Sequence, residues 1–397
     1  MKSLKELYRV GKGPSSSHTM GPQRAAKLFQ ERCPNASYYE VTLYGSLAAT
    51  GKGHMTDVAI EEVLRPHKTV NIIWQPQTFL PYHPNGMKFV GKDLNGDIID
   101  EWTVYSIGGG AISDGTAGNE ELGAKDVYDL NKLADIKQWC YDNGRSFWEY
   151  VEKCESEDVW DYLDMVWQTM KQSIRNGLNH EGVLPGPLKL QRKAKGYRAS
   201  LQSRGLVYAY ALAVSEENAS GGTIVTAPTC GACGVLPAVL YHMFTSHDMS
   251  EQRILRALAT AGLVGNIVKQ NASISGADVG CQGEVGVACA MASAAACQLF
   301  GGSPAQVEYA AEMGLEHHLG MTCDPVCGLV QIPCIERNAF AAARALDADL
   351  YASFSDGHHT VSFDRVVEVM RQTGHDLPSL YKETSEGGLA KGFPRDI

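Results

Sequence analysis

Five neighbouring residues near the start of the chain carry small polar or ionisable side chains. They lie in the stretch GPSSSHTMGP and are Ser15, Ser16, Ser17, His18 and Thr19. A helix-like run follows from Pro22, and the first turn of a helix has unpaired N–H groups and a partial positive charge that suit an anion. The hydroxyl groups add donors for a carboxylate or a phosphate, although the spacing is not that of a Walker A loop. Helix capping alone would explain the serines, whereas His18 adds an acid/base or ligand group.

Eleven cysteines, eight of them after residue 229, form the second group of reactive side chains. Their number is odd and the chain starts without an apolar export signal, so we expect reduced thiols rather than a disulfide framework. Cys281, Cys323 and Cys334 lie in the separate stretches DVGCQGEVG, GMTCDPVC and IPCIERN. Three thiolates on separate loops suit an iron–sulfur cluster that keeps one iron for substrate.

The cysteine spacings also allow other interpretations. Cys323, Cys327 and Cys334 have C-x3-C and C-x6-C spacings, which could hold zinc but lack the two tight knuckles of a ribbon or finger. Cys230 and Cys233 form a C-x2-C pair, but the βαβ pattern of a thioredoxin-like dithiol does not surround them. Spacing alone therefore leaves the choice between iron–sulfur, zinc and redox chemistry open.

The elements that must position these residues indicate an α+β fold. In the first part of the chain we expect strands or hairpins over 38–50, 68–74 and 83–110, and helices after Pro22 and over 57–64. From about residue 126 the strand signals fade and helical runs follow. The sequence thus predicts a mixed α/β N-terminal domain (1–115), a Gly-rich linker (116–130) and a mostly α-helical C-terminal domain (131–397).

Particular residues mark the predicted helices. Ser303, Pro304 and Gln306 form a good helix start, with serine as N-cap and glutamine as its reciprocal partner. Gly374 is expected to end the last helix. Cys289 and Cys297, eight residues apart on an Ala-rich run, are expected to be small buried hydrophobes.

Composition and charge fit an ordinary globular protein. The 397 residues exceed what one small core needs, so two or three domains are expected. The net charge of −10 is spread along the chain, which argues against nucleic acid or an anionic membrane as partner. No apolar run reaches 18 residues, so we expect no membrane span, and a cytoplasmic location is the prediction.

Six long stretches, taken in order, resemble the iron–sulfur L-serine dehydratases of bacteria. They are GPSSSHTMGP, HPNGM, NHEGVLPGPLKLQRKA, IVTAPTCGACGVLPAVL, NASISGADVGCQGEVGVACAMA and EHHLGMTCDPVCGLVQIPCIERNA, and the resemblance runs from about residue 3 to about residue 390. It implies an N-terminal domain similar to an allosteric substrate-binding module of some phosphoglycerate dehydrogenases, followed by a helical catalytic domain. It also implies a [4Fe–4S] cluster on Cys281, Cys323 and Cys334, and a homodimer.

The resemblance implies roles for further residues. L-Serine would lose its hydroxyl to an iron acting as Lewis acid and its Cα proton to a base, giving pyruvate and ammonia. His18 and His54 are the candidates for the base or its assistant, and the loop 15–19 would bind the substrate carboxylate. Lys269 and Asn271, just before SISGADVG, are expected to hold substrate or cluster sulfides, whereas His83 in HPNGM is equally compatible with a role in a turn.

The chain also departs from the family. Cys327 stands where many relatives have glycine, so we expect it not to be a ligand. Cys230 often corresponds to asparagine. No cysteine follows Cys334, so a state in which a C-terminal cysteine reaches the fourth iron is not expected here.

Two alternatives from other classes remain open at this point. A pyridoxal-phosphate-dependent dehydratase would perform the same reaction, and SGGTIVTAPTCGACG is a conceivable phosphate cup, but only Lys269 has any context for a Schiff base. A binding module stapled by zinc would use the thiols structurally and would leave serine unchanged.

Overall fold

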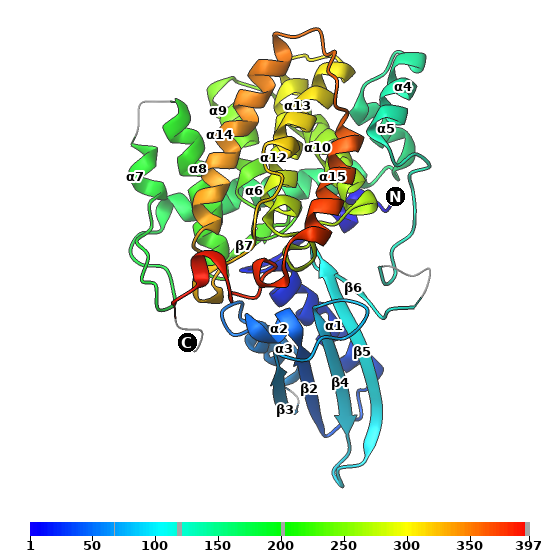
Figure 1. Ribbon diagram of the computed structural model, residues 1–397, viewed down its shortest axis with the longest axis vertical. Coiled ribbons are helices and arrows are strands. Elements are labelled where there is room, and N and C mark those ends of the chain that lie inside the picture. Colours follow the sequence, from blue (N-terminus) through cyan, green and yellow to red (C-terminus); the bar gives the residue numbers. More distant parts are fainter. Residues whose placement is uncertain (67, 117–120, 200–202, 394–397) are drawn as a thin grey trace.

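A computed structural model describes residues 1–66, 68–116, 121–199 and 203–393 and shows an N-terminal part built on a sheet and a larger helical part (Figure 1). The α+β architecture predicted from the sequence is confirmed. Among the described residues, none of the helices combines the length and the apolar character that crossing a lipid bilayer requires.

The N-terminal part consists of one five-stranded sheet with helices packed against it. Its elements are the π-helical turn η2 (Ser16–Met20), α1 (Gly21–Arg32), β2 (Tyr38–Tyr44), α2 (Gly45–Ala49), α3 (Thr56–Leu64), β3 (Thr69–Gln75), β4 (Gly86–Lys92), β5 (Ile98–Gly108) and β6 (Ala111–Ser113). The strand order is β3-β2-β4-β5-β6, in which β2 and β3 are parallel and the other pairs are antiparallel. The parallel pair is joined through α2 and α3, as a parallel connection requires a crossover.

Alternation along the strands explains how this sheet acquires a core. In β2, every second side chain is buried, so Val41 and Leu43 face the helices while their neighbours are partly exposed. They pack with Phe29 of α1, Ile60 of α3 and Phe89 of β4. The strand expected over 38–50 is shorter than predicted, because Gly45 adopts φ +51° and a helix, α2, follows it.

The helical part surrounds one central helix. Its elements are α4 (Leu133–Asn143), α5 (Phe147–Cys154), α6 (Val159–Asn179), α7 (Ala194–Arg198), α8 (Ser203–Ala219), β7 (Thr223–Val225), α9 (Val235–Ser246), α10 (Glu251–Asn271), α11 (Gly276–Val279), η3 (Cys281–Gly283), α12 (Val285–Leu299), α13 (Pro304–Glu316), η4 (Val326–Gly328), α14 (Cys334–Ser353), α15 (Phe363–Asp376), η5 (Ser379–Tyr381) and η6 (Gly388–Ala390). Helix α12 is buried along most of its length and contacts α9, α10, α13 and α14.

Small side chains allow this close packing. A side chain on Gly314 of α13 would place its Cβ 2.8 Å from the Cα of Ala290, so the two helices touch through their backbones. Cys289 and Cys297 on α12 are fully buried, as the sequence predicts. The many alanines and other small side chains of α12 let α9, α10, α13 and α14 pack around it.

The helix ends agree only in part with the sequence analysis. The capping box of Ser303 and Gln306 at the start of α13 is confirmed. The prediction that Gly374 ends the last helix is wrong, because α15 continues to Asp376. A Cβ on Gly374 would lie 2.6 Å from the Cβ of Val279, so this glycine allows α11 to approach α15 closely.

The first twelve residues lie with the helical part, although the sequence assigns them to the N-terminal domain. Leu4, Leu7 and Tyr8, in and beside η1 (Leu4–Glu6), belong to the helical core. Strand β1 (Val10–Lys12) then pairs antiparallel with β7. The chain therefore starts on one part and crosses to the other just before the turn η2.

Of the expected linker (116–130), residues 117–120 lie outside the described residues. Glu121 is 3% exposed, and the N–H of Leu122 donates to the carbonyl of Ile112 (2.9 Å). The described part of this segment is thus fixed to both parts of the molecule. The division at residues 115 and 131 otherwise stays a prediction.

Candidate active site

Three buried thiols come together from separate elements. Cys281 begins η3, Cys323 lies in the loop after α13, and Cys334 begins α14; none is more than 8% exposed. The Sγ atoms of Cys281 and Cys323 lie within 4.8 Å of each other and of a carboxylate oxygen of Glu284. Burial alone would lower the pKa of the Arg337 guanidinium, but its proximity to all three thiols raises it. The structure therefore brings together the three cysteines that the family resemblance singles out.

The surroundings of these thiols fit an iron–sulfur cluster. A side chain on Gly276 would place its Cβ 3.1 Å from the Sγ of Cys323 and 2.7 Å from Glu284 Oε2, so only glycine leaves this space beside the thiols. A hydrogen bond of the Cys323 thiol to Cys281, together with burial, raises the pKa of Cys323 well above its usual value, and burial does the same for Cys334. Such thiols ionise when they coordinate a metal, and the Arg337 cation would offset part of the resulting negative charge.

Cys327 and Cys230 lie near this group but in different surroundings. Cys327 is in η4 with φ 55°, among apolar neighbours that include Val326 and Leu329. Cys230 is fully buried, and its Sγ lies 3.4 Å from the Sδ of Met20. That Cys327 is not a ligand remains a prediction.

The turn η2 places a neutral histidine opposite the thiols. His18 is completely buried, and burial lowers its pKa to about 4. Its Nε2 lies 3.2 Å from the carbonyl oxygen of Ser46, and its Nδ1 lies 2.8 Å from Ser17 Oγ. Because a carbonyl oxygen can only accept, the ring proton lies on Nε2 and Nδ1 carries a lone pair. A π-helical turn at this point is in keeping with the frequent use of such turns at functional sites.

His54 lies against His18 with a free ring nitrogen. The two ring centroids are 4.6 Å apart, and Nδ1 of His54 is buried without a hydrogen-bond partner in the described part of the chain. Burial, with a smaller effect of His18, lowers the pKa of His54 well below its usual value. A Cβ on Gly53 would lie 2.5 Å from the carbonyl oxygen of Gly328. A glycine is therefore needed where the His54 loop meets the loop that follows Cys323. His54 is therefore neutral, buried and able to accept a proton.

The hydroxyl groups of the turn serve partly to hold its shape. Ser15 Oγ accepts from the N–H of His18 (3.0 Å), and Thr19 Oγ1 accepts from the N–H of Ser15 (3.1 Å). The Thr19 hydroxyl also donates to the carbonyl of His54 (2.6 Å), which fixes the two histidine loops to each other. Ser16 and Ser17 are buried in the same turn.

Glu383, which the sequence analysis did not identify, joins the histidines to the thiols. Its N–H donates to the carbonyl of Cys323 (2.8 Å), its own carbonyl accepts from Ser46 Oγ (2.8 Å), and its Oε1 lies 3.4 Å from His18 Nδ1. One carboxylate oxygen of Glu383 and one ring nitrogen each of His18 and His54 lie within 4.8 Å of one another. In Figure 1 the C-terminal segment (red) crosses the boundary between the helical part and α2 of the N-terminal part.

Three more buried polar side chains were also missed. Among the described residues, both amide atoms of Asn85 and the hydroxyls of Ser106 and Ser275 have no hydrogen-bond partner. A Cβ on Gly21, the residue after η2, would lie 2.3 Å from Ser106 Oγ. Buried polar atoms without partners are costly, so they indicate a ligand or water at this place. The HPNGM motif, which contains Asn85, was the available signal.

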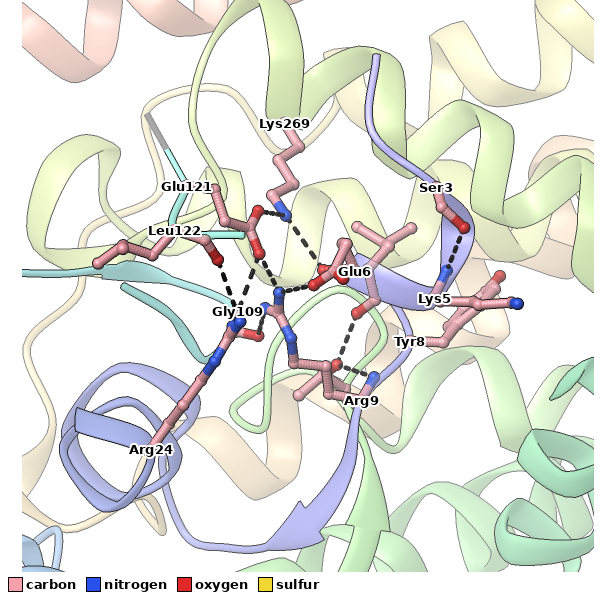
Figure 2. Close-up of polar contacts among 12 residues, drawn as sticks. Ser3, Lys5, Glu6, Tyr8, Arg9, Arg24, Gly109, Glu121, Leu122 and Lys269 are labelled. Atoms are coloured by element: carbon pink, nitrogen blue, oxygen red, sulfur yellow. Dashed lines mark hydrogen bonds and ion pairs between the residues drawn. The ribbon is translucent and has the colours of Figure 1, made fainter. Parts of the chain in front are cut away.

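Lys269 and Asn271 have partners of a different kind. Figure 2 shows Lys269 in an ion-pair network with Glu121 (2.7 Å), which in turn contacts Arg9 and Arg24. Lys269 also donates to the carbonyl of Glu6 (3.0 Å). The network joins α10, the first residues of the chain and the segment after β6.

The electrostatics of this network favour ionised partners. Burial alone would raise the pKa of Glu121, but Lys269 and Arg9 together lower this pKa to about 2. The amide of Asn271 donates to the carbonyls of Asn131 (2.6 Å) and Ile267 (3.0 Å). These contacts support structural roles for Lys269 and Asn271 rather than the substrate or sulfide contacts expected of them.

A structural role for Lys269 makes a testable prediction. Lys269→Met leaves the buried carboxylate of Glu121 without one of its two close cationic partners. We therefore expect the free energy of unfolding to fall by about 3 kcal/mol. The rate of catalysis per bound cluster should change less than tenfold. Urea unfolding followed by circular dichroism, together with turnover normalised to iron content, measures both quantities.

The matched control is Lys193→Met, which removes the half-exposed ion pair with Glu336 and should cost less than about 1 kcal/mol. A Lys269→Met protein that unfolds like the wild type but loses its turnover would restore the catalytic role expected from the sequence.

A cavity of about 860 Å³ is separate from this site. It is lined by residues of α13, α14 and the 358–361 loop, among them Glu312, His317, Arg344 and His359. The thiols and histidines described above are instead almost completely buried.

The geometry is that of an enzyme whose buried thiols could hold a metal group beside neutral histidines. Residues 56–390 match the family model described as serine dehydratase alpha chain, and residues 3–69 match serine dehydratase beta chain. The chain belongs to the serine dehydratase family.

Curated relatives align with nearly the whole chain. The L-serine dehydratase of Haemophilus influenzae is 41% identical, over 98% of this chain and 99% of its own. L-serine dehydratase 1 of Escherichia coli is also 41% identical, over the same shares. The L-serine dehydratase of Helicobacter pylori is 35% identical, over 98% of each chain.

Proposed function

We propose that this protein is an L-serine dehydratase, a carbon–nitrogen lyase that converts L-serine to pyruvate and ammonia. The observation that carries this proposal is the meeting of three buried thiols with two buried neutral histidines at Glu383. Family membership supports the same activity and favours it over the pyridoxal-phosphate alternative.

The proposed cofactor is a [4Fe–4S] cluster held by Cys281, Cys323 and Cys334. When bound, the cluster supplies a Lewis-acidic iron that polarises the substrate hydroxyl. Arg337 balances the charge of the thiolates, and Gly276 keeps the space beside them open. Family membership also favours this cofactor over the zinc-stapled binding module.

His54 is the proposed base. Its Nδ1 is buried without a partner, and its low pKa keeps it unprotonated at neutral pH, as the removal of a Cα proton requires. His18 presses against the ring of His54 and is itself fixed by Ser46 and Ser17. The proposed role of His18 is to orient the His54 ring and to help keep that ring unprotonated.

The proposed site for the substrate carboxylate is the turn η2, as the sequence analysis expects. The partnerless amide of Asn85 and hydroxyl of Ser106 lie beside this turn and add donors to that of Ser16, whereas the Ser17 hydroxyl donates to His18 Nδ1 and would contact the carboxylate only if it turned away from that ring. Ser15 and Thr19 would act indirectly, by holding the turn to the His54 loop. A homodimer and a cytoplasmic location remain predictions of the sequence analysis.

The direct test is product analysis. Protein purified without oxygen should form pyruvate and ammonia in equal amounts from L-serine, measured by lactate dehydrogenase coupling and by an ammonia assay. L-Threonine has one extra methyl group, and we expect it to react about 10- to 100-fold less efficiently than L-serine. Protein that contains iron and sulfide but forms no pyruvate from L-serine would contradict the proposal.

A further inference from the structure

Glu383 is a buried carboxyl group without a cationic partner. The residue is 5% exposed, and its Oε2 has no hydrogen-bond partner among the described residues. The ionisable side chain nearest to its carboxyl group in the ion-pair contacts of the described residues is His18, whose Nδ1 lies 3.4 Å from Glu383 Oε1. That contact is not a salt bridge, because the ring proton of His18 is on Nε2, where it is donated to Ser46, and the facing Nδ1 carries a lone pair. Burial, with a smaller effect of Glu284, raises the pKa of this carboxyl group well above its usual value, although the backbone of Ala277 lowers it in part. A cation bound at Oε2 would stabilise the ionised form.

The backbone around Glu383 holds the carboxyl group in this position. The residue has φ 57°, in the left-handed region that a side chain of this size rarely adopts. Two hydrogen bonds between the Cys323 segment and the Glu383 segment maintain this backbone conformation. Cys323 N–H donates to the carbonyl of Tyr381, and Glu383 N–H donates to the carbonyl of Cys323, each at 2.8 Å. Unusual backbone conformations of this kind persist at ligand sites when the neighbouring structure enforces them.

The groups around Glu383 could receive an ammonium group. Its Oε1 lies 3.4 Å from His18 Nδ1, and a ring nitrogen of His54 lies within 4.8 Å of ligand atoms of both residues. Among the described residues, Oε2 of Glu383 and Nδ1 of His54 are both buried without a hydrogen-bond partner. An amino acid whose ammonium group donates to Oε2 would have its Cα, one bond further on, within reach of His54.

We propose that Glu383 binds the α-ammonium group of the substrate and so orients its Cα–H bond toward His54. This inference rests on the proposed function. It assigns one polar group of the chain to each end of the amino acid: the turn η2 to the carboxylate and Glu383 to the ammonium. It also predicts selection of amino acids over hydroxy acids, because an analogue without the ammonium leaves the buried carboxyl group unpaired.

The test compares two unreactive ligands that differ only in the amino group, L-alanine and propanoate. Their inhibition constants against L-serine are measured with the cluster-containing enzyme, or by calorimetry where a variant turns over too slowly. In Glu383→Gln, which keeps the shape and removes the charge, we expect L-alanine to bind about 10- to 100-fold more weakly. Propanoate should change less than threefold, and the iron content should equal that of the wild type.

Glu386→Gln, an exposed carboxyl three residues further along the same segment, is the matched control and should leave both constants unchanged. Equal weakening of both ligands, or loss of iron from Glu383→Gln alone, would overturn the assignment, the latter in favour of a metal ligand.

A measurement on the wild-type enzyme tests the proposal even if the Glu383→Gln variant fails to fold. The unaltered enzyme should bind L-alanine at least about tenfold more tightly than propanoate, and equal affinities would refute the proposal. These results are separable from the proposed function, because turnover of L-serine by the wild type does not depend on their outcome.

Discussion

Replacement of Cys281, Cys323 or Cys334 by alanine is expected to remove the cluster and to lower pyruvate formation to the background rate. Each change leaves two thiols, so the cluster loses one of its three proposed protein ligands. Because the cluster supplies the Lewis acid, we expect a loss of at least about 10⁴-fold. Iron and sulfide per chain and the visible absorbance of anaerobically purified variants measure the effect.

Cys327→Ala is the matched control for these variants. It removes a buried thiol from the same loop as Cys323 but on η4, where the neighbours are apolar. Most of the iron and of the activity should remain. Iron loss as complete as that of the other three variants would mean that the ligand set is assigned wrongly.

Replacement of His54 by glutamine is expected to lower kcat by about 10²- to 10⁴-fold while the cluster remains bound. The amide keeps the approximate size of the ring but cannot accept the Cα proton. Since burial holds the pKa of His54 well below its usual value, the wild-type imidazole is neutral throughout the neutral range, and its titration should not lower kcat between pH 8 and 6.5. Steady-state kinetics with L-serine, normalised to iron content, provide the comparison.

A histidine outside the site serves as the control. His242 on α9 is 3% exposed, so His242→Gln tests the general cost of replacing a buried ring. Its kcat per cluster should stay within about threefold of the wild type. Should His54→Gln retain the same kcat as this control, another group must take the proton.

The sequence predicts the reactive groups of this site better than their arrangement. The stretches around Cys281, Cys323 and Cys334 identify the thiols through a family resemblance. The structure places Cys281 and Cys323 within 4.8 Å of each other, and all three thiols act on the pKa of Arg337. Their C-x41-C-x10-C spacing alone could not show this, because the distance between two loops depends on how α12 and α13 pack. The family resemblance indicated His18 and His54 as candidates for the base or its assistant, and their rings are in contact.

Contacts between distant segments account for what the sequence analysis missed. Glu383 belongs to a stretch without any chemical signature, and its position depends on hydrogen bonds with the Cys323 loop. Lys269 follows the periodicity of α10, but its partner Glu121 comes from the segment after β6, which no local pattern could indicate. Gly374 was expected to end a helix because helices often stop at glycine, whereas here close packing against Val279 decides its place.

The most direct test of the central claim is a titration of activity against cluster content. Protein stripped of metal is reconstituted without oxygen in steps with iron and sulfide, and pyruvate formation from L-serine is measured at each step. We predict a rate that rises in proportion to bound cluster and saturates at about four irons and four sulfides per chain, with none restored by zinc. Full activity in metal-free protein, or activity restored by zinc alone, would contradict the account.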